Sequence, residues 1–507
     1  MIAPFDCSPG ARADTRPAAL LAVACASVCL ITVATGACRR DDPVRPRPAA
    51  SQHVTIAIPS LVAPDTPLLF VLTQTRLIRL DATGVEQPAF IERWSSSPDG
   101  LTWTLVVRPD ERLHDGTQAT AADVAARIRE AAASPDAGPG LWPVVGVDAL
   151  DDHRVRIRLK EPTSLLLETL ALAEALPAGA YRNVAPPDAP PSLRAVVRAG
   201  EPAPAIGSVD IKRYDTPRAA VVALLRGEVD VLYEVPGEAR ALLDADGGVR
   251  IYPHVKPYVL TLGLNHRHPL LARREVRLAL NAAIDRRALV TSVPGGVGVP
   301  AADLLWHQHW SRPHADDGRL LRHDPAAARA WLDSVGLTRR VDPGGVVKPR
   351  LTLRCLVLDE PLSVQVAARL QQAYDDVGIA LDLEAVSLEQ LLTRLETGKF
   401  ETFVSPMVSG YGMGMAYLQY GPHDRPRIVD DGYVAGARAS EAIRRASSRE
   451  ALAAAIADLH RVLIDDPPAV HLFWQETSRA VGRRITVPAE AGDVLASLPR
   501  WGVVTPP

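Results

Sequence analysis

Two histidine pairs have the residue type and spacing that come closest to a reactive site. His266 and His268 stand two residues apart in NHRHP, and His307 and His309 do so in WHQHW. On a strand, alternate residues share a face, so each pair could offer two imidazoles to one metal ion. No nearby carboxylate or cysteine completes a ligand set. We therefore expect no metal site, and we interpret these histidines as polar cleft-lining or surface residues.

The chain lacks the local motifs of common hydrolases. It has neither a G-x-S-x-G elbow nor an H-E-x-x-H helix, and its serines, histidines and aspartates are scattered. Cys355 is the only cysteine after Cys38, so no internal disulfide is expected in the mature body. It lies in LTLRCLVL, a run that predicts a strand with a buried thiol. We predict a protein that is not an enzyme and has no cofactor.

Composition indicates a large soluble protein without a basic surface. The 507 residues suffice for two or three domains, and 47% hydrophobic with 23% charged residues is ordinary for a globular chain. The formal net charge is −3. A nucleic-acid-binding protein would be expected to carry a basic excess, so we predict no nucleic-acid partner.

The N-terminus reads as an export signal. Residues Ala18–Ala37 form the only long apolar run, and Cys38 follows at once, before a proline-rich polar stretch. This arrangement indicates a lipoprotein signal peptide over residues 1–37, a lipidated Cys38 and a flexible tether over 38–51. An uncleaved membrane anchor is the alternative, because twenty apolar residues could span a bilayer. Either way the globular part is exported, to the periplasm or the cell surface.

The elements that must hold any site alternate between strands and helices. Residues 95–128 predict a tight turn at Pro98–Gly100, an alternating strand, and a helix capped by Thr120 with Asp123. Residues 185–207 are proline-rich and are expected to be irregular. From residue 350 the chain reads strand, helix, strand, helix, strand, which predicts βα units and a sheet packed by helices. The apolar run PPAVHLFWQ, which ends at Gln475, predicts a last strand. The fold class is α/β.

Several segments together resemble a known family. The segment ERWSSSPDGLTWTLVVRPDERLHDGTQATAADV is similar to a signature of bacterial extracellular solute-binding proteins of family 5, the peptide- and nickel-type binding proteins of ABC importers. Further similar segments follow in family order: GVDALDDHRVRIRLKEP, LLRGEVDVLYEVP, VRLALNAAIDRRALV, HDPAAARAWLDSVGL and DDPPAVHLFW.

The resemblance implies a two-lobed periplasmic-binding-protein-like fold of the cluster C type, with a small α+β subdomain added to lobe one. Lobe one would span 52–258, including the subdomain at about 75–180, and lobe two would span 259–472. Residues 473–507 would return to lobe one. The chain would cross between the lobes near Pro257–Asn265 and His471–Gln475, beside a cleft that closes by hinge motion.

Aromatic and small polar residues near these crossings are the expected ligand contacts. They are Tyr411, Gly410, Trp306, Trp310, Asn265, Tyr258 and Trp474. Relatives that bind peptides often carry an aspartate in the loop that here reads SPMVSGYGMGMAYLQYG, yet this chain has no acid between Glu401 and Asp424. We therefore expect a ligand that is neutral or apolar at that end, unless another acid such as Asp65 substitutes.

The resemblance implies a monomeric substrate-binding lipoprotein that passes a peptide or similar small molecule to ABC permease subunits, held to the membrane by its lipid anchor. Two alternatives stay open: a ligand-sensing or adaptor lipoprotein without a transport role, and a binder of nickel or a metal chelate.

Overall fold

The computed structural model describes residues 52–59, 66–109, 111–173, 175–186, 189–197, 203–293, 298–315, 317–489 and 492–504. The predicted signal peptide, Cys38, the tether and Asp65 lie outside these residues. Within them, no helix combines the length and the apolar character needed to cross a membrane.

One mixed sheet of eleven strands runs through the molecule, and its order joins segments that are distant in sequence. The ten strands along its path are, in order, β10 (Tyr181–Asn183), β11 (Ser192–Ala195), β12 (Ile206–Tyr214), β1 (Gln52–Pro59), β13 (Val231–Leu232), β21 (Ala469–Gly482), β14 (Val249–Leu264), β20 (Thr402–Val408), β18 (Leu351–Leu358) and β19 (Ile379–Val386). The eleventh, β15 (Gly298–Pro300), pairs with β21. We call the body around β1, β12 and β13 the first lobe, and the body around β18, β19 and β20 the second lobe.

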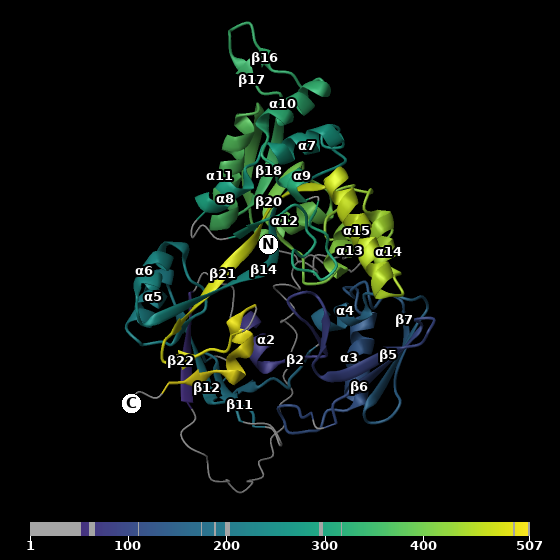
Figure 1. Ribbon diagram of the computed structural model, residues 1–507, viewed down its shortest axis with the longest axis vertical. Helices are drawn as coiled ribbons and strands as arrows, with labels where there is room; N and C mark the ends of the chain where they lie inside the picture. The colour runs from purple at the N-terminus through teal and green to yellow at the C-terminus, as the bar shows by residue number, and fades with distance from the viewer. Residues whose placement is uncertain are drawn as a thin grey trace, which may run out of the picture.

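Two long antiparallel strands, β14 and β21, connect the lobes (Figure 1). Their pairing is interrupted in the middle, because Val255 faces Glu476 while Val259 faces Trp474. The extra residues of β14 include Pro257, which has no N–H to donate to a ladder. Both predicted crossings lie on these strands, apart from Asn265, which follows the end of β14. The bulge is a natural place for the chain to bend. The predicted lobe boundaries at 258/259 and 472/473 remain predictions.

A compact subdomain with its own core lies beside the first lobe, at the lower right of Figure 1. We call residues 75–180 the accessory subdomain. Its four-stranded antiparallel sheet has the order β5 (Ile91–Ser96), β6 (Thr102–Val107), β8 (Arg154–Leu159) and β7 (Val144–Ala149). The predicted capping box is present: Thr120 and Asp123 bond each other's backbone N–H at the start of α3 (Ala121–Ala133). Two shorter elements matter below, the hairpin of β3 (Ile78–Leu80) with β4 (Glu86–Pro88) and helix α4 (Leu166–Ala173).

The second lobe is built from the predicted βα units and further helices. Cys355 is fully buried in β18, as its apolar strand predicts, and burial raises the pKa of its thiol to about 12. The helices packed around these strands are α7 (Arg274–Ala282), α8 (Arg286–Ser292), α9 (Asp317–Leu321), α10 (Pro325–Ser334), α11 (Pro361–Asp375), α12 (Leu388–Glu396), α13 (Gly414–Tyr420), α14 (Ala437–Arg444) and α15 (Arg449–Asp465).

Two expectations differ from the structure. The proline-rich composition of residues 185–207 predicts an irregular segment, yet Ser192–Ala195 forms β11, because its backbone pairs with both β10 and β12. The local pattern predicts a final strand that ends near Gln475, but β21 continues to Gly482, since its second half pairs with β13 and with the start of β14. Both differences arise from pairing with distant strands, which the local pattern does not encode.

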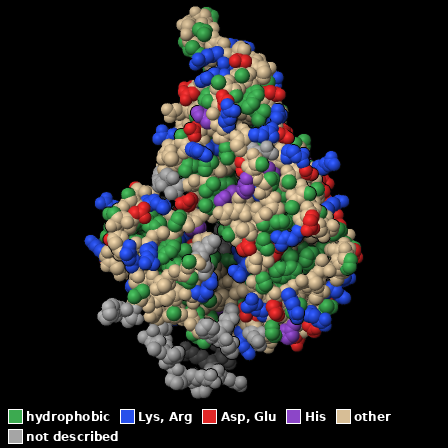
Figure 2. Space-filling model, viewed as in Figure 1, with side chains coloured by type: hydrophobic (Ala, Val, Ile, Leu, Met, Phe, Trp, Pro, Cys, Tyr) green, Lys and Arg blue, Asp and Glu red, His purple; other side chains and the backbone are tan. Residues whose placement is uncertain are grey.

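Charged side chains of both signs are interspersed over the face seen in Figure 2. Many form surface ion pairs, such as Arg394 with Glu384. Exposed pairs of this kind contribute little to folding, so the stability of each lobe must come from its apolar core.

Candidate ligand cleft

Three predicted aromatic residues meet in one cluster. The ring centroid of Trp306 lies 5.1 Å from that of Tyr411 and 5.0 Å from that of Trp474, both edge to face. Trp306 and Trp474 are each only 2% exposed, while Tyr411 is half-buried. Edge-to-face pairs of this kind are worth about 0.5–1.5 kcal/mol each beyond area burial. We call these three residues the aromatic cluster.

The cluster forms where three segments of the second lobe and the connecting strands converge. Trp474 lies on β21 beside the bulge, opposite Val259 of β14 and Val299 of β15. Trp306 follows β15, and Tyr411 follows β20 in the loop before α13. The pairing of β15 with β21 and of β20 with β14 therefore fixes the positions of all three rings.

The β3–β4 hairpin of the accessory subdomain contacts this cluster through its turn. Nε1 of Trp306 donates to the carbonyl oxygen of Ala82 at 2.7 Å, and the backbone N–H of Trp310 donates to the carbonyl of Thr83 at 2.9 Å. Asp81 shapes the turn, because its carboxylate accepts from the N–H groups of Thr83 and Val85. The turn thus presents backbone acceptors to the cluster.

Gly84 allows the close approach of this turn. Its φ is +79°, and a Cβ at this position would lie 2.3 Å from the carbonyl oxygen of Tyr411 and 2.6 Å from Cδ2 of His309. A side chain cannot fit there without moving backbone. The structure therefore holds the accessory subdomain in direct contact with the segment that carries Tyr411.

A second contact between the same parts is made by Glu168 of α4. Its carboxylate oxygens accept from the backbone N–H of Met413 at 2.8 Å and of Gly414 at 2.5 Å. The sequence of the loop shows no acid, and this one comes from about 245 residues earlier in the chain. The only local sign of it is a single acid in the apolar run LLLETLALA.

The two histidines beside the cluster, His307 and His309, are neutral near pH 7. Burial, with the charge of Arg312, lowers the pKa of His307 to about 4, and burial likewise lowers the pKa of His309 to about 4. Burial raises the pKa of the Tyr411 hydroxyl. His307 packs against Trp306 and Trp474, and its Nε2 is buried without a hydrogen-bond partner among the described residues. The cluster itself therefore offers rings and neutral polar atoms, while the charges of Asp493 and Arg76 act on the Tyr411 hydroxyl with opposite effects on its pKa.

Charged groups of the first lobe near the connecting strands are paired with one another. Arg479 of β21 forms two hydrogen bonds with Asp493 and lies over the ring of Tyr233 at 3.9 Å. Lys256, in the bulge, pairs with Glu234 at 3.6 Å. No sequence motif marks these residues. Of these groups, Asp493 acts on the aromatic cluster, because its charge adds to the rise of the Tyr411 pKa.

The other predicted contacts take different positions. Trp310 is half-buried, with the Arg449 guanidinium 4.2 Å above its ring. Gly410 has a φ of +69°, which lets the chain turn after β20. Tyr258 is half-buried in the bulge, opposite Val408. Gly410 adjoins Tyr411 in the loop, and Trp310 joins the hairpin turn.

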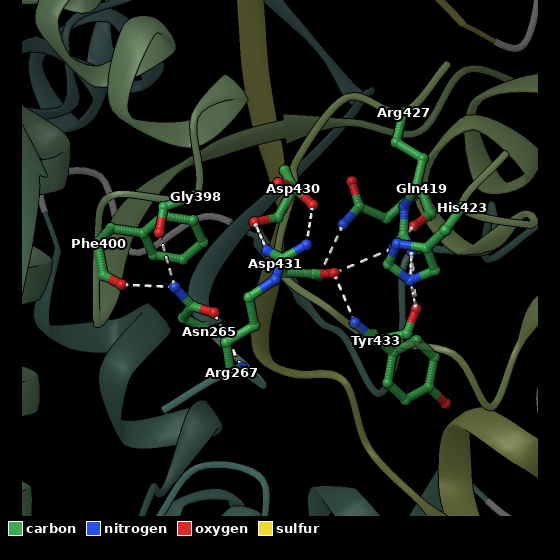
Figure 3. A network of polar contacts seen from close by, with 10 residues as sticks. All are labelled: Asn265, Arg267, Gly398, Phe400, Gln419, His423, Arg427, Asp430, Asp431 and Tyr433. Atoms are coloured by element: carbon green, nitrogen blue, oxygen red, sulfur yellow. Dashed lines mark hydrogen bonds and ion pairs between the residues drawn. The ribbon is translucent and has the colours of Figure 1, made fainter. Parts of the chain in front are cut away.

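Asn265 lies elsewhere. It follows the far end of β14, six residues beyond Val259, so it is roughly 20 Å along the strand from the cluster. Its amide donates to the carbonyls of Gly398 and Phe400, as Figure 3 shows. This network continues through Arg267 to Asp430. The structure places Asn265 in a loop-fixing network of the second lobe and does not bring it to the aromatic cluster.

The histidine pairs do not lie on strands, so the alternation considered for them does not apply. His266 contacts the carbonyl of Pro468, and His309 contacts the hydroxyl of Ser311.

Among the described residues, one group has metal-like spacing, formed by Asp303, Asp317 and His460. Arg312 bonds both of its carboxylates. Burial alone would raise the pKa of Asp303, but Arg312 and His460 lower it to about 2. The Arg312 guanidinium is therefore the positive charge that balances the two carboxylates.

Residues 86–426 match the family model for bacterial extracellular solute-binding proteins, family 5, middle region. The match covers more than half of the chain, so the chain belongs to this family. The family is one of solute-binding proteins, which agrees with the prediction that the chain is not an enzyme.

The similarity to individual proteins is moderate. A Brucella ovis protein whose name assigns it to ABC transporter peptide binding is 28% identical over 316 residues, covering 56% of this chain and 57% of that protein. The chain thus spans somewhat more than half the length of that relative. The nickel-binding periplasmic protein of Escherichia coli is 24% identical over 404 residues, covering 69% of this chain and 74% of that protein.

The fold is shared with solved structures. NikA from Brucella suis, in complex with Fe(III)-EDTA, superposes with a TM-score of 0.77 at 18% identity, covering 89% of this chain and all of that one. The predicted two-lobed α/β periplasmic-binding-protein fold with an added small subdomain is confirmed.

Proposed function

We propose that the chain is the substrate-binding lipoprotein of an ABC importer. It captures a small ligand, a peptide or similar molecule, between its lobes by hinge closure, and it delivers that ligand to the permease subunits as a monomer. Family membership supports the binding role. The anchor is a lipid on Cys38, supported by the apolar run and the cysteine that follows it.

One observation carries this proposal: the accessory subdomain meets the second lobe around the aromatic cluster. The contacts join Ala82 to Trp306, Thr83 to Trp310 and Glu168 to the loop at Met413. Connecting strands with a bulge beside Trp474 provide the bend that hinge closure needs. A ligand entering beside Tyr411 would be held by residues from both sides of this contact.

The chemistry of the cluster favours a ligand that is neutral or apolar at this end. A buried, unpaired ammonium would cost on the order of 3–5 kcal/mol, and the loop that carries Tyr411 has no acid of its own. Glu168 lies behind that loop, with each oxygen already accepting a backbone N–H. The rings of Tyr411, Trp306 and Trp474 offer polarisable apolar surface instead.

The test is a thermal-shift comparison of short free peptides with their N-acetylated forms, because a ligand stabilises in proportion to ln(1 + [L]/Kd). We expect equal or larger shifts with the acetylated peptides, and a loss of both shifts in Tyr411→Ala. The matched control is Tyr214→Ala, a half-buried tyrosine of β12 in the first lobe. A hundredfold preference for free peptides, roughly 2.7 kcal/mol, would show that the amine is recognised and would contradict the proposed ligand chemistry.

A further inference from the structure

Glu168 is a buried carboxylate that joins the accessory subdomain to the loop Ser409–Gly414, which carries Tyr411. It is 7% exposed, although it lies in the first turn of α4. Both of its oxygens are used by the loop, one by the N–H of Met413 and one by the N–H of Gly414.

The glycines of the loop are fitted to this carboxylate. A Cβ on Gly412 would lie 2.2 Å from Cδ of Glu168, and one on Gly414 would lie 2.9 Å from Oε1. From sequence alone, glycines in such a loop suggest places where a ligand approaches the backbone. In the structure, the group that approaches Gly412 and Gly414 is Glu168.

No cation neutralises this carboxylate among the described residues. The charged group that faces it is Glu86 of β4. Arg76 of β2 (Thr75–Arg76) lies at the other end of α4, where it donates to the carbonyls of Ala171 and Leu172. The loop itself contributes one titratable group, the Tyr411 hydroxyl. Glu168 is therefore held by two N–H groups alone, beside a like charge.

We propose that Glu168 is a positioning residue of the ligand cleft, which fixes the Tyr411 loop against the accessory subdomain. The significance of this contact for ligand binding rests on the function proposed above. The contact itself joins residues of this chain alone and needs no ligand to form.

The direction of the pH effect follows from burial. Burial raises the pKa of Glu168 from its ordinary value of 4.5 to about 7, against the opposing effect of the two N–H groups, and Glu86 adds to the rise. A carboxyl group whose pKa is raised by burial in the native contact stabilises that contact fully below its ordinary pKa. This contribution is lost as the pH rises from the ordinary pKa to the raised one. The contact is thus strongest below about pH 4.5 and weakens as the pH rises from there to about 7.

Amide hydrogen exchange in the full-length, ligand-free protein tests the positioning role. We expect Glu168→Ala to speed exchange at Met413 and Gly414 by about tenfold or more, as the loss of about 1.4 kcal/mol would, and Glu168→Gln, which keeps one acceptor, to have a smaller effect. Glu130→Gln is the matched control, since Glu130 lies on the same subdomain with a side chain that is 76% exposed. Unchanged exchange in both Glu168 variants would overturn the proposal.

The pH dependence of the thermal midpoint tests whether burial in this contact raises the pKa of Glu168. We expect the midpoint of the wild type, relative to Glu168→Gln, to fall as the pH rises from about 4.5 to about 7 and to change little above that. Glu86→Gln removes the facing charge and should move this change to lower pH. A difference that stays constant over the whole range would contradict a raised pKa of Glu168. These two measurements use no ligand. If they fail, the proposed binding function is unaffected, and if the peptide test fails, the proposed role of Glu168 is unaffected.

Discussion

Nε1 of Trp306 donates a hydrogen bond of 2.7 Å to the carbonyl oxygen of Ala82, two residues that stand 224 positions apart in the chain. This bond joins a tryptophan of the second lobe to a hairpin turn of the accessory subdomain. A substitution that removes this bond therefore tests the contact between the second lobe and the accessory subdomain directly.

Replacement of Trp306 by phenylalanine should weaken this contact. The change keeps an aromatic ring but removes the donor, which leaves the carbonyl of Ala82 without its partner at a cost of about 1 kcal/mol. We expect a lower thermal midpoint and a larger radius of gyration in small-angle scattering. Trp103→Phe is the control, because the buried Nε1 of Trp103 has no partner among the described residues. Equal effects of the two substitutions would argue against a role for the Ala82 bond.

Substitution of Gly84 by alanine should open the same contact by steric exclusion. Backbone strain at positive φ costs on the order of 1–3 kcal/mol, and the new methyl group would in addition overlap the carbonyl of Tyr411. Gly116→Ala separates the two effects, since Gly116 also has a positive φ, +87°, but no atom lies within 4 Å of the position that its Cβ would take. We expect both variants to lose stability and only Gly84→Ala to expand in small-angle scattering.

Much of the local structure can be predicted from sequence. The capping box of Thr120 and Asp123 and the buried strand position of Cys355 each follow from a short pattern, and both are present. The contacts that build the cleft cannot be predicted in this way. Glu168 bonds a loop some 245 residues away, and nothing adjacent to it in sequence identifies that partner.

For the same reason, only some of the residues predicted for the candidate site come together in the structure. Trp306, Tyr411 and Trp474 lie near segments that the family resemblance assigns to the cleft, and the structure brings their rings together. Asn265 is a candidate on the same ground, but it follows the end of β14 and lies far from the part of that strand that borders the cluster. Position along a strand of 16 residues decides which side chains can reach one site.

Acid should destabilise the protein through its buried histidines. His471 is 3% exposed and bonds Thr261 and Tyr420, and burial lowers its pKa from 6.5 to about 4. A histidine whose pKa is lowered in the folded protein contributes its full stabilisation at a pH above its ordinary pKa. That contribution is lost as the pH falls through the lowered pKa. The free energy of unfolding should therefore fall as the pH is lowered from 6.5 to about 4. In His471→Gln we expect this fall to be smaller by an amount on the order of 1–3 kcal/mol. His314→Gln, with a side chain that is 59% exposed, should leave that fall unchanged.

The lipid anchor makes a separate prediction. Cys38→Ser should abolish incorporation of a radioactive fatty acid and should block cleavage of the leader, because the peptidase acts on the lipidated cysteine. Cys355→Ser is the control, since Cys355 is buried in the second lobe. Labelling that persists in Cys38→Ser would reject lipidation at this residue and favour the uncleaved anchor.

Capture of a small ligand between the lobes at the aromatic cluster can be measured by native mass spectrometry of the protein as purified, followed by denaturing mass spectrometry of what it releases. We predict one small molecule per chain in the wild type and in Tyr214→Ala, and a strongly reduced share of loaded protein in Tyr411→Ala. Equal loading of the wild type and Tyr411→Ala would reject the cluster as the binding site, because the ligand would then be held at a place that the cluster does not form.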